Sequence, residues 1–589
     1  MRENNIHKRL LSVMLVCSIL LTGCTGHGQD KDEIKKDFDE YTDNLFLEDI
    51  SRNTIDLHYT LAYPENYGIE DYEVTLGELS MEDMEDTEKE LKELKEELLK
   101  YDRSALTESQ KLTYDLLMDY VDTELDAVDL VYYWEPLSPM GGYQAQLPIL
   151  LAEYTFRRER DVEDYLVLLT QVDDMFEDII AYEEKKADEG FFMADFALEG
   201  VIEQCEEFIA EPEENYLIQV FDDKIDALEG ISEEDKEAYK EKNRELVTGE
   251  VVDSYRMLAD ALEELEGRGE NDLGLCYYED GTEYYEYLVL TETGSDAGVE
   301  ELKERTEKFL ENREEEVYTL VMENPDLLDV FTDPDAYGFP YTDPEEIMED
   351  LIEKCSRDFP EPPQVDYTIK YVHPSLEEHL NPAFYLTPPI DDIKNNVIYI
   401  NEKYMDEDIY TTLAHEGYPG HLYQEVSTAS HGLSLVRNLL SYPGYTEGWA
   451  TYTEMYSYNI SGLDRDAARL LACDNIYSLG ISAYIDMGVN YDGWDVSDVE
   501  EYLAGFGIED EETARDIFEA VVEEPAEYLR YFIGYLEFNG LKNRAKDQLG
   551  EDFELKEFHE FIIEIGPAPF YIIRERMEQW IKEKKEDIQ

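Results

Sequence analysis

The sequence predicts a mainly α-helical fold in two lobes, with a small β-sheet beside a short helix that carries two histidines. Apolar residues recur at helical spacing along most of the chain, whereas only two short stretches are rich in the β-branched and aromatic residues typical of strands. The chain has 589 residues, which exceeds the roughly 250–300 residues at which a single hydrophobic core stops growing. Two lobes are therefore expected.

The N-terminus predicts a processing signal. Basic residues precede an apolar stretch at residues 10–21, too short for a spanning helix, which needs about 20 residues. The stretch ends in Leu-Thr-Gly-Cys at residues 21–24, which resembles the lipobox of bacterial lipoproteins. We expect a signal peptide at residues 1–23, lipidation of Cys24, and an extracytoplasmic protein held on the bacterial cell membrane by its lipid alone. A plain secretion signal with an incidental cysteine is the alternative.

Helical periodicity is clearest in five ranges, 87–101, 107–125, 160–187, 235–265 and 298–322. In the first range, Leu91, Leu94, Leu98 and Leu99 fall on one predicted face. Residues 325–344, rich in Pro, Asp and Gly, predict a loop. Asp343-Pro344-Glu345-Glu346 is typical of a helix start, with Asp as the cap and Pro in the first position.

The two predicted strands are residues 366–372 and 396–401. The second lies shortly before the histidine-containing helix, so we expect the sheet beside that helix. The predicted division of the mature chain is an N-terminal helical lobe at 24–355 and a catalytic lobe at 356–589. An exposed edge at residues 397–400 could bind an extended peptide by strand addition; a sheet edge without a ligand is the alternative.

The charge of the chain excludes polyanionic partners. It carries 144 acidic and 48 basic residues, for a net charge of -96, so it repels nucleic acid and anionic membranes. Such acidity suits a secreted protein at high ionic strength, or it reflects the composition bias of the source organism.

The cysteines after Cys24 are scattered and form no Cys-x-x-Cys pair, which argues against a cysteine zinc site. They are Cys205, Cys276, Cys355 and Cys473. One or two disulfides and four buried thiols both remain open.

Residues 415–421 read His-Glu-Gly-Tyr-Pro-Gly-His, and Glu447 follows twenty-six residues later. Two histidines and a carboxylate are the usual ligands of a catalytic zinc, and a glutamate beside the first histidine is the usual general base. In such helices the histidines are normally four residues apart. Here they are six apart, about 240° around an ideal helix. The metal hypothesis therefore requires a break between them.

The residues between the histidines can supply that break. Pro419 lacks an amide hydrogen, and its ring would clash with the carbonyl of His415 in a continuous helix. Gly417 and Gly420 permit unusual backbone torsions. The alternative is an ordinary helix end with a buried histidine.

Two sequence blocks resemble a known family. Residues 415–424 and 447–454 resemble the signatures of a bacterial family catalogued as domain of unknown function eight-eight-five, which is placed among the zincin-like metallopeptidases. Residues 525–534 and 566–569 resemble two weaker blocks, with Glu527 where the family usually has Gln. The resemblance covers nearly the whole mature chain and implies a helical, gluzincin-type zinc metallopeptidase fold.

The resemblance also implies site roles. His415, His421 and Glu447 would hold one zinc ion, with Glu416 as the general base. Tyr531 would donate a hydrogen bond to the developing oxyanion, although its place in a stripe of tyrosines also fits core packing.

Four further residues are candidates around this set. Glu454 lies two turns after Glu447 on the same helix face and is expected to support the ligands rather than bind metal. Glu425, four residues after His421, could accept the ring proton of that histidine, or be a solvated surface acid. In the family an aromatic strand ending in Asn precedes the motif, which implies that Tyr399 and Asn401 contact substrate.

The predicted function is a secreted, lipid-anchored zinc metallopeptidase that hydrolyses peptides with metal-activated water. A non-peptide amide hydrolase using the same zinc site is one alternative. A catalytically inactive, peptide-binding lipoprotein is another, although the intact Glu416 argues against it.

Overall fold

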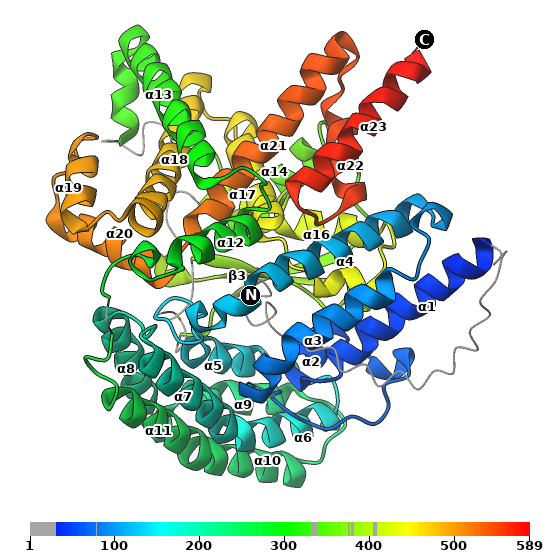
Figure 1. Cartoon of the computed structure of the whole chain (residues 1–589), viewed down its shortest axis with the longest axis vertical. Coiled ribbons are helices and arrows are strands. Elements are labelled where there is room, and N and C mark those ends of the chain that lie inside the picture. The colour runs from blue at the N-terminus through cyan, green and yellow to red at the C-terminus, as the bar shows by residue number, and fades with distance from the viewer. Residues whose placement is uncertain are drawn as a thin grey trace.

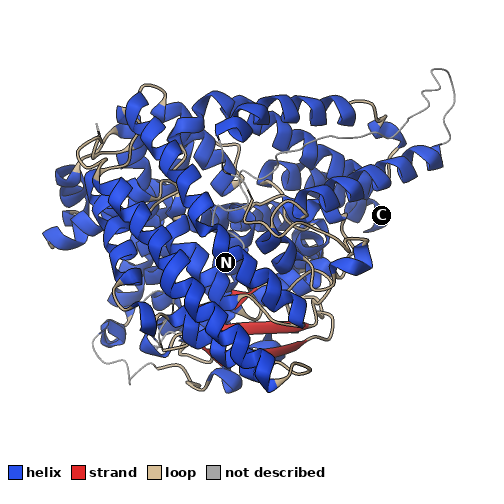
Figure 2. Ribbon diagram, turned by 90° about the horizontal axis from the view of Figure 1, so that it is seen from below, coloured by secondary structure: helices blue, strands red, loops and turns tan. Residues whose placement is uncertain are grey.

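The computed structural model describes residues 31–588, apart from residues 78, 80, 270, 332–337, 375, 376, 378–381 and 405–408. Its described part is mainly helical with one small sheet (Figures 1 and 2), as the sequence predicts. The predicted signal peptide and Cys24 lie outside the described residues. Within that part, no helix is both long and apolar enough to cross a membrane.

The first half of the chain is entirely helical in its regular structure. It begins with α1 (Lys31–Ile50), α2 (Thr54–Thr60), α3 (Met81–Leu98) and α4 (Glu108–Ala127). A second group gathers at one end of the molecule (Figure 1): α5 (Tyr143–Glu153), α6 (Glu159–Leu168), α7 (Val172–Glu189), α8 (Asp195–Ile209), α9 (Tyr216–Ala227), α10 (Glu233–Leu246) and α11 (Val252–Glu263). Then follow α12 (Gly281–Thr293), α13 (Val299–Glu323) and α14 (Pro344–Cys355).

The second half contains the sheet and the remaining helices. The strands are β1 (Asp366–Tyr371), β2 (Ala383–Leu386) and β3 (Asn395–Ile400). The helices are α15 (Ile409–Glu416), α16 (His421–Ala429), α17 (Pro443–Ile460), α18 (Arg465–Met487), α19 (Val496–Ala504), α20 (Glu511–Glu523), α21 (Glu527–Leu549), α22 (Leu555–Ile565) and α23 (Phe570–Ile588).

The helical periodicity is confirmed in all five predicted ranges, although two of the ranges each contain two helices. Range 160–187 holds α6 and α7, and range 235–265 holds α10 and α11 joined by a π-helical turn at residues 247–251. Leu91, Leu94 and Leu98 are buried. The placement of Leu99 with them is wrong: this side chain is 61% exposed, because it lies about 100° around the helix from Leu98.

Helix α14 starts where the sequence predicts. Asp343 accepts hydrogen bonds from the backbone N–H groups of Glu345 and Glu346, with Pro344 in the first turn. The loop predicted at 325–344 also contains a short 3-10 helix, Pro325–Phe331.

The strand order is β1-β3-β2. Strand β1 pairs with β3 in parallel, and β2 pairs with β3 antiparallel, with Phe384 opposite Tyr399. The expected strand addition along residues 397–400 is therefore wrong: both sides of β3 are already paired, and β1 and β2 form the edges. Strand β2 was not predicted because a four-residue Ala-Phe-Tyr-Leu run is too short to reveal a period of two.

The sheet lies between two hydrophobic clusters. Ala383 and Tyr385 belong to the cluster built from α1–α4, α14–α17 and α21–α23. Phe384 points to the opposite face, as alternation in a strand requires, and joins the cluster of α5–α11. It stacks on Tyr399 with ring centroids 4.9 Å apart. The division of the chain near residue 355 stays a prediction.

Cys205, Cys276, Cys355 and Cys473 carry free thiols, and all but Cys276 are buried. Of the two alternatives for the cysteines, the structure supports unpaired thiols rather than disulfides.

Candidate metal centre

The helix carrying the histidine motif is broken as the metal hypothesis requires. Helix α15 ends at Glu416, and α16 begins at His421. The turn between them contains a cis Tyr418–Pro419 peptide bond. A Cβ on Gly420 would lie 1.8 Å from the backbone oxygen of His415, so only glycine fits this close approach. The Nε1–H of Trp449 donates to the Pro419 carbonyl at 2.9 Å and ties the turn to α17.

The break brings three potential ligands together. Nε2 of His415 lies 3.3 Å from Oε2 of Glu447, and Nε2 of His421 lies 3.5 Å from the same oxygen. One ligand atom from each residue lies within 4.8 Å of the others. Zinc bonds of about 2.0–2.2 Å in tetrahedral geometry place ligand atoms about 3.4 Å apart. Two of the three separations match that spacing.

The chemistry of these groups also fits a cation. Oε2 of Glu447 is buried, and no described residue donates a hydrogen bond to it. Burial raises the pKa of Glu447, but the nearby His421 and His415 reverse this and hold it well below its ordinary value. Burial lowers the pKa of His415, yet its contacts with Glu447 and Glu454 raise it well above its ordinary value. The acids around these imidazoles favour an added positive charge, which zinc would supply in place of protons.

Glu454 contacts the His415 ring at the nitrogen that faces away from Glu447. Its Oε2 lies 3.1 Å from Nδ1 of His415, and its Oε1 accepts a hydrogen bond of 3.0 Å from Nδ2 of Asn475. A protonated Nδ1 donating to Glu454 leaves Nε2 of His415, on the side of Glu447, as the unprotonated ring nitrogen. Asn475 was missed because nothing in its local sequence on α18 marks it.

Glu416 is held by the sheet. The backbone N–H of Tyr385 in β2 donates to Oε2 of Glu416 at 2.8 Å. Because β2 is an edge strand, this amide points away from β3 and towards α15. Tyr385 was missed because its contribution comes from its backbone.

Helix α21 approaches the centre through a pair of glycines. A Cβ on Gly448 of α17 would lie 2.5 Å from Cα of Gly534 of α21, so the two helices touch at their backbones. This packing places Arg530 near Glu447. Burial lowers the pKa of Arg530, but the charges of Glu527, Tyr531 and Glu447 outweigh it and raise the pKa. Tyr531 is partly buried on this helix, and its role as oxyanion donor stays a prediction.

Arg530 is a further residue that the sequence did not indicate. It is 4% exposed and forms ion pairs with Glu292 of α12, at 3.2 Å, and with Glu527. The one feature of the sequence that pointed to Arg530 is its position between Glu527 and Tyr531, inside residues 525–534 of the family resemblance.

Three other candidates remain from the sequence. Tyr399 donates to Glu153 at 2.8 Å, and the fully buried Asn401 donates to the backbone of Glu377 at 2.8 Å. Both side chains thus hold the sheet to its surroundings, and their substrate contacts stay predictions. Glu425 lies one turn after His421 on α16 and is partly buried; its contact with the His421 ring also stays a prediction.

Comparison with known proteins places this chain among relatives of unknown activity. A family model described as "Bacterial protein of unknown function (DUF885)" matches residues 64–577. No curated protein sequence matches the chain.

Two solved structures share its fold. One, "the putative lipoprotein from Colwellia psychrerythraea", has a TM-score of 0.79 at 18% identity, covering 94% of this chain and 99% of that one. The other, "a putative lipoprotein of unknown function from Shewanella oneidensis", has a TM-score of 0.63 at 16% identity, covering 93% and 100%. Such low identities indicate a shared fold alone.

Proposed function

Because the chain belongs to the DUF885 family and brings two histidines and a glutamate together, we propose that it is a zinc-dependent peptidase. The observation that carries the proposal is the convergence of His415, His421 and Glu447 across a helix break that the sequence motif requires. The zincin-like, gluzincin-type assignment belongs to this proposal. So does the lipid anchor at Cys24, which is supported by the lipobox and by neighbours described as lipoproteins.

The proposed chemistry needs one ion and five side chains. A zinc ion held by His415, His421 and Glu447 would supply a Lewis acid that lowers the pKa of water and polarises a carbonyl. Glu416 accepts the proton of the attacking water and delivers it to the leaving nitrogen. The Tyr385 amide keeps the Glu416 carboxylate in one position. Tyr531 donates its phenol hydrogen to the carbonyl oxygen as negative charge develops there.

The substrate would lie along β2 rather than β3. Strand β2 lies at an edge of the sheet, and its Tyr385 amide donates to Glu416 there. An extended peptide pairing with this edge would pass beside the general base. An edge strand beside the general base favours a peptide over a compact amide substrate.

The test combines metal content with activity. Purified protein lacking residues 1–23, loaded with zinc, is compared with His415→Ala and Glu416→Gln variants by elemental analysis and by digestion of a peptide library. We expect about one zinc in the wild type, none in His415→Ala, and zinc without cleavage in Glu416→Gln. Zinc without cleavage in the wild type would favour a non-peptide amide substrate or a binding role. A wild type that binds no zinc would refute the proposal.

A further inference from the structure

A cavity of about 130 Å³ is linked to the candidate metal centre through Arg530. Arg530 lines it and lies close enough to Glu447 for the two charges to interact. Cavities of about 150 Å³ hold a benzene-sized molecule, so this one matches a single amino-acid side chain. The proposed catalytic chemistry does not use it.

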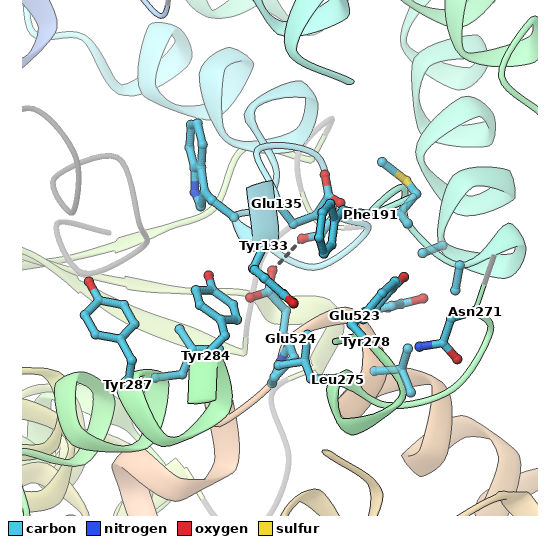
Figure 3. Close-up of a pocket in the computed structure, with 18 of the residues that line it drawn as sticks. Tyr133, Glu135, Phe191, Asn271, Leu275, Tyr278, Tyr284, Tyr287, Glu523 and Glu524 are labelled. Atoms are coloured by element: carbon cyan, nitrogen blue, oxygen red, sulfur yellow. Dashed lines mark hydrogen bonds between the residues drawn. The ribbon is translucent and has the colours of Figure 1, made fainter. Parts of the chain in front are cut away.

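The walls of this cavity are aromatic. Tyr133 is at the centre of a group of rings, with centroids 4.7 Å from Phe191, 5.1 Å from Tyr284 and 6.0 Å from Tyr278. Figure 3 shows Tyr133 and Phe191 on one side of the cavity, with Glu523, Glu524 and Tyr278 facing them. Ring faces carry negative partial charge and attract cations within about 6 Å.

The cations near the cavity are already engaged. Arg530 pairs with Glu292 and Glu527. Lys186, next to the cavity, pairs with Glu135 and Glu183. Neither cation is therefore available to neutralise further carboxylates.

Two more carboxylates stand at the end of α20. Glu523 is the last residue of this helix and Glu524 its C-terminal cap, where the helix dipole adds negative charge. Burial and the charges of Glu519 and Glu524 raise the pKa of Glu523 to about 7. Among the residues that the structure describes, no cation pairs with Glu523.

We propose that this cavity binds the cationic side chain of a substrate residue, lysine or arginine, close to the bond that is cut. Aromatic faces would surround the aliphatic stem and the charged head, and the Glu523 carboxylate would pair with that head. The inference rests on the peptidase function proposed above and gives that function a substrate class, peptides with basic residues.

The test uses matched peptides and two charge-matched variants. Fluorogenic peptides differ only in carrying lysine or norleucine, placed in turn at each position around the scissile bond. For the best position, we expect the wild type to show about tenfold higher kcat/KM with lysine. Glu523→Gln should reduce this ratio about fivefold. Glu512→Gln, on the exposed first turn of the same helix, should preserve the ratio. Equal kcat/KM for the two wild-type substrates, or an unchanged ratio in Glu523→Gln, would overturn the inference.

A binding measurement separates this inference from the peptidase proposal. Zinc-loaded Glu416→Gln protein is titrated calorimetrically with the lysine and norleucine peptides, and the titration is repeated with Glu416→Gln/Glu523→Gln. Tighter binding of the lysine peptide, lost in the double variant, would support the cavity even where the wild type cleaves nothing. Equal affinity for both peptides would overturn it even where cleavage is observed.

Discussion

Oε2 of Glu454 lies 3.1 Å from Nδ1 of His415, on the side of the ring away from Glu447. The glutamate is itself fixed by Asn475, so the ring orientation is set by two residues on two helices. We expect Glu454→Gln to weaken zinc binding about 10–100-fold, since supporting partners of metal-binding histidines have effects of that size. Competition with a chelator of known affinity measures the change.

A second variant tests the same contact: Asn475→Asp keeps a side chain of the same size but replaces the donor by a second carboxylate next to Glu454. Zinc affinity should fall in this variant too, while Glu512→Gln leaves it unchanged. Full zinc affinity in Glu454→Gln would show that the contact with His415 has no orienting role.

Gly420 is expected to be irreplaceable. The Cβ of Gly420→Ala would meet the His415 carbonyl at 1.8 Å, and backbone cannot yield as a flexible side chain does. We expect a loss of about 3 kcal/mol or more in the free energy of unfolding, together with loss of bound zinc. Denaturant unfolding and elemental analysis measure both.

Gly540→Ala serves as its control. This glycine lies inside α21 with open space around it, so alanine should stabilise the protein by about 0.5–1 kcal/mol. Similar stability in the two variants would contradict the close approach at Gly420.

Metal removal should lower thermal stability. The carboxylates of Glu447, Glu454 and Glu416 surround His415, and a bound divalent cation would relieve their repulsion. At zinc concentrations a thousandfold above Kd, binding adds about 4 kcal/mol to the free energy of unfolding. Scanning calorimetry with and without a chelator should therefore show a lower Tm for the apoprotein. His415→Ala should show no such difference, and a chelator effect that persists there would point to another site.

Asp486 predicts a pH dependence of stability. This fully buried carboxyl bonds with Tyr285, Asn490 and the Ala526 amide, and burial raises its pKa from 3.8 to about 7. Between those values the folded state keeps a proton that the unfolded state has lost. Its stabilising contribution is therefore complete below about pH 4 and disappears as the pH rises through about 7.

The variant Asp486→Asn should remove this dependence. The free energy of unfolding of the wild type should fall relative to Asp486→Asn between pH 4 and 7, by about 4 kcal/mol at most. Urea unfolding at several pH values measures the difference, with the exposed Asp516→Asn as control. Parallel pH profiles for wild type and Asp486→Asn would show that Asp486 ionises alike in both states.

Local sequence features predicted the helical class and several boundaries. Leucine periodicity located α3, and Asp343 before Pro344 located the start of α14, because helical periods and caps depend on residues only a few positions apart. The same local reasoning failed at Leu99, which lies about 100° around the helix from Leu98 and is exposed, and at β2, which is too short to show a pattern.

The candidate site, too, could be predicted from the sequence only in part. The sequence by itself determined its parts, because the motif contains two histidines, a glutamate and the Pro-Gly residues that a helix break requires. Only the tertiary structure decided that Glu447 meets both imidazoles, that Asn475 fixes Glu454, that β2 rather than β3 lies at an edge of the sheet, and that Arg530 interacts with the charge of Glu447. Each of these depends on long-range packing, such as the contact between Gly448 and Gly534, and local sequence carries no record of which distant backbone will lie alongside.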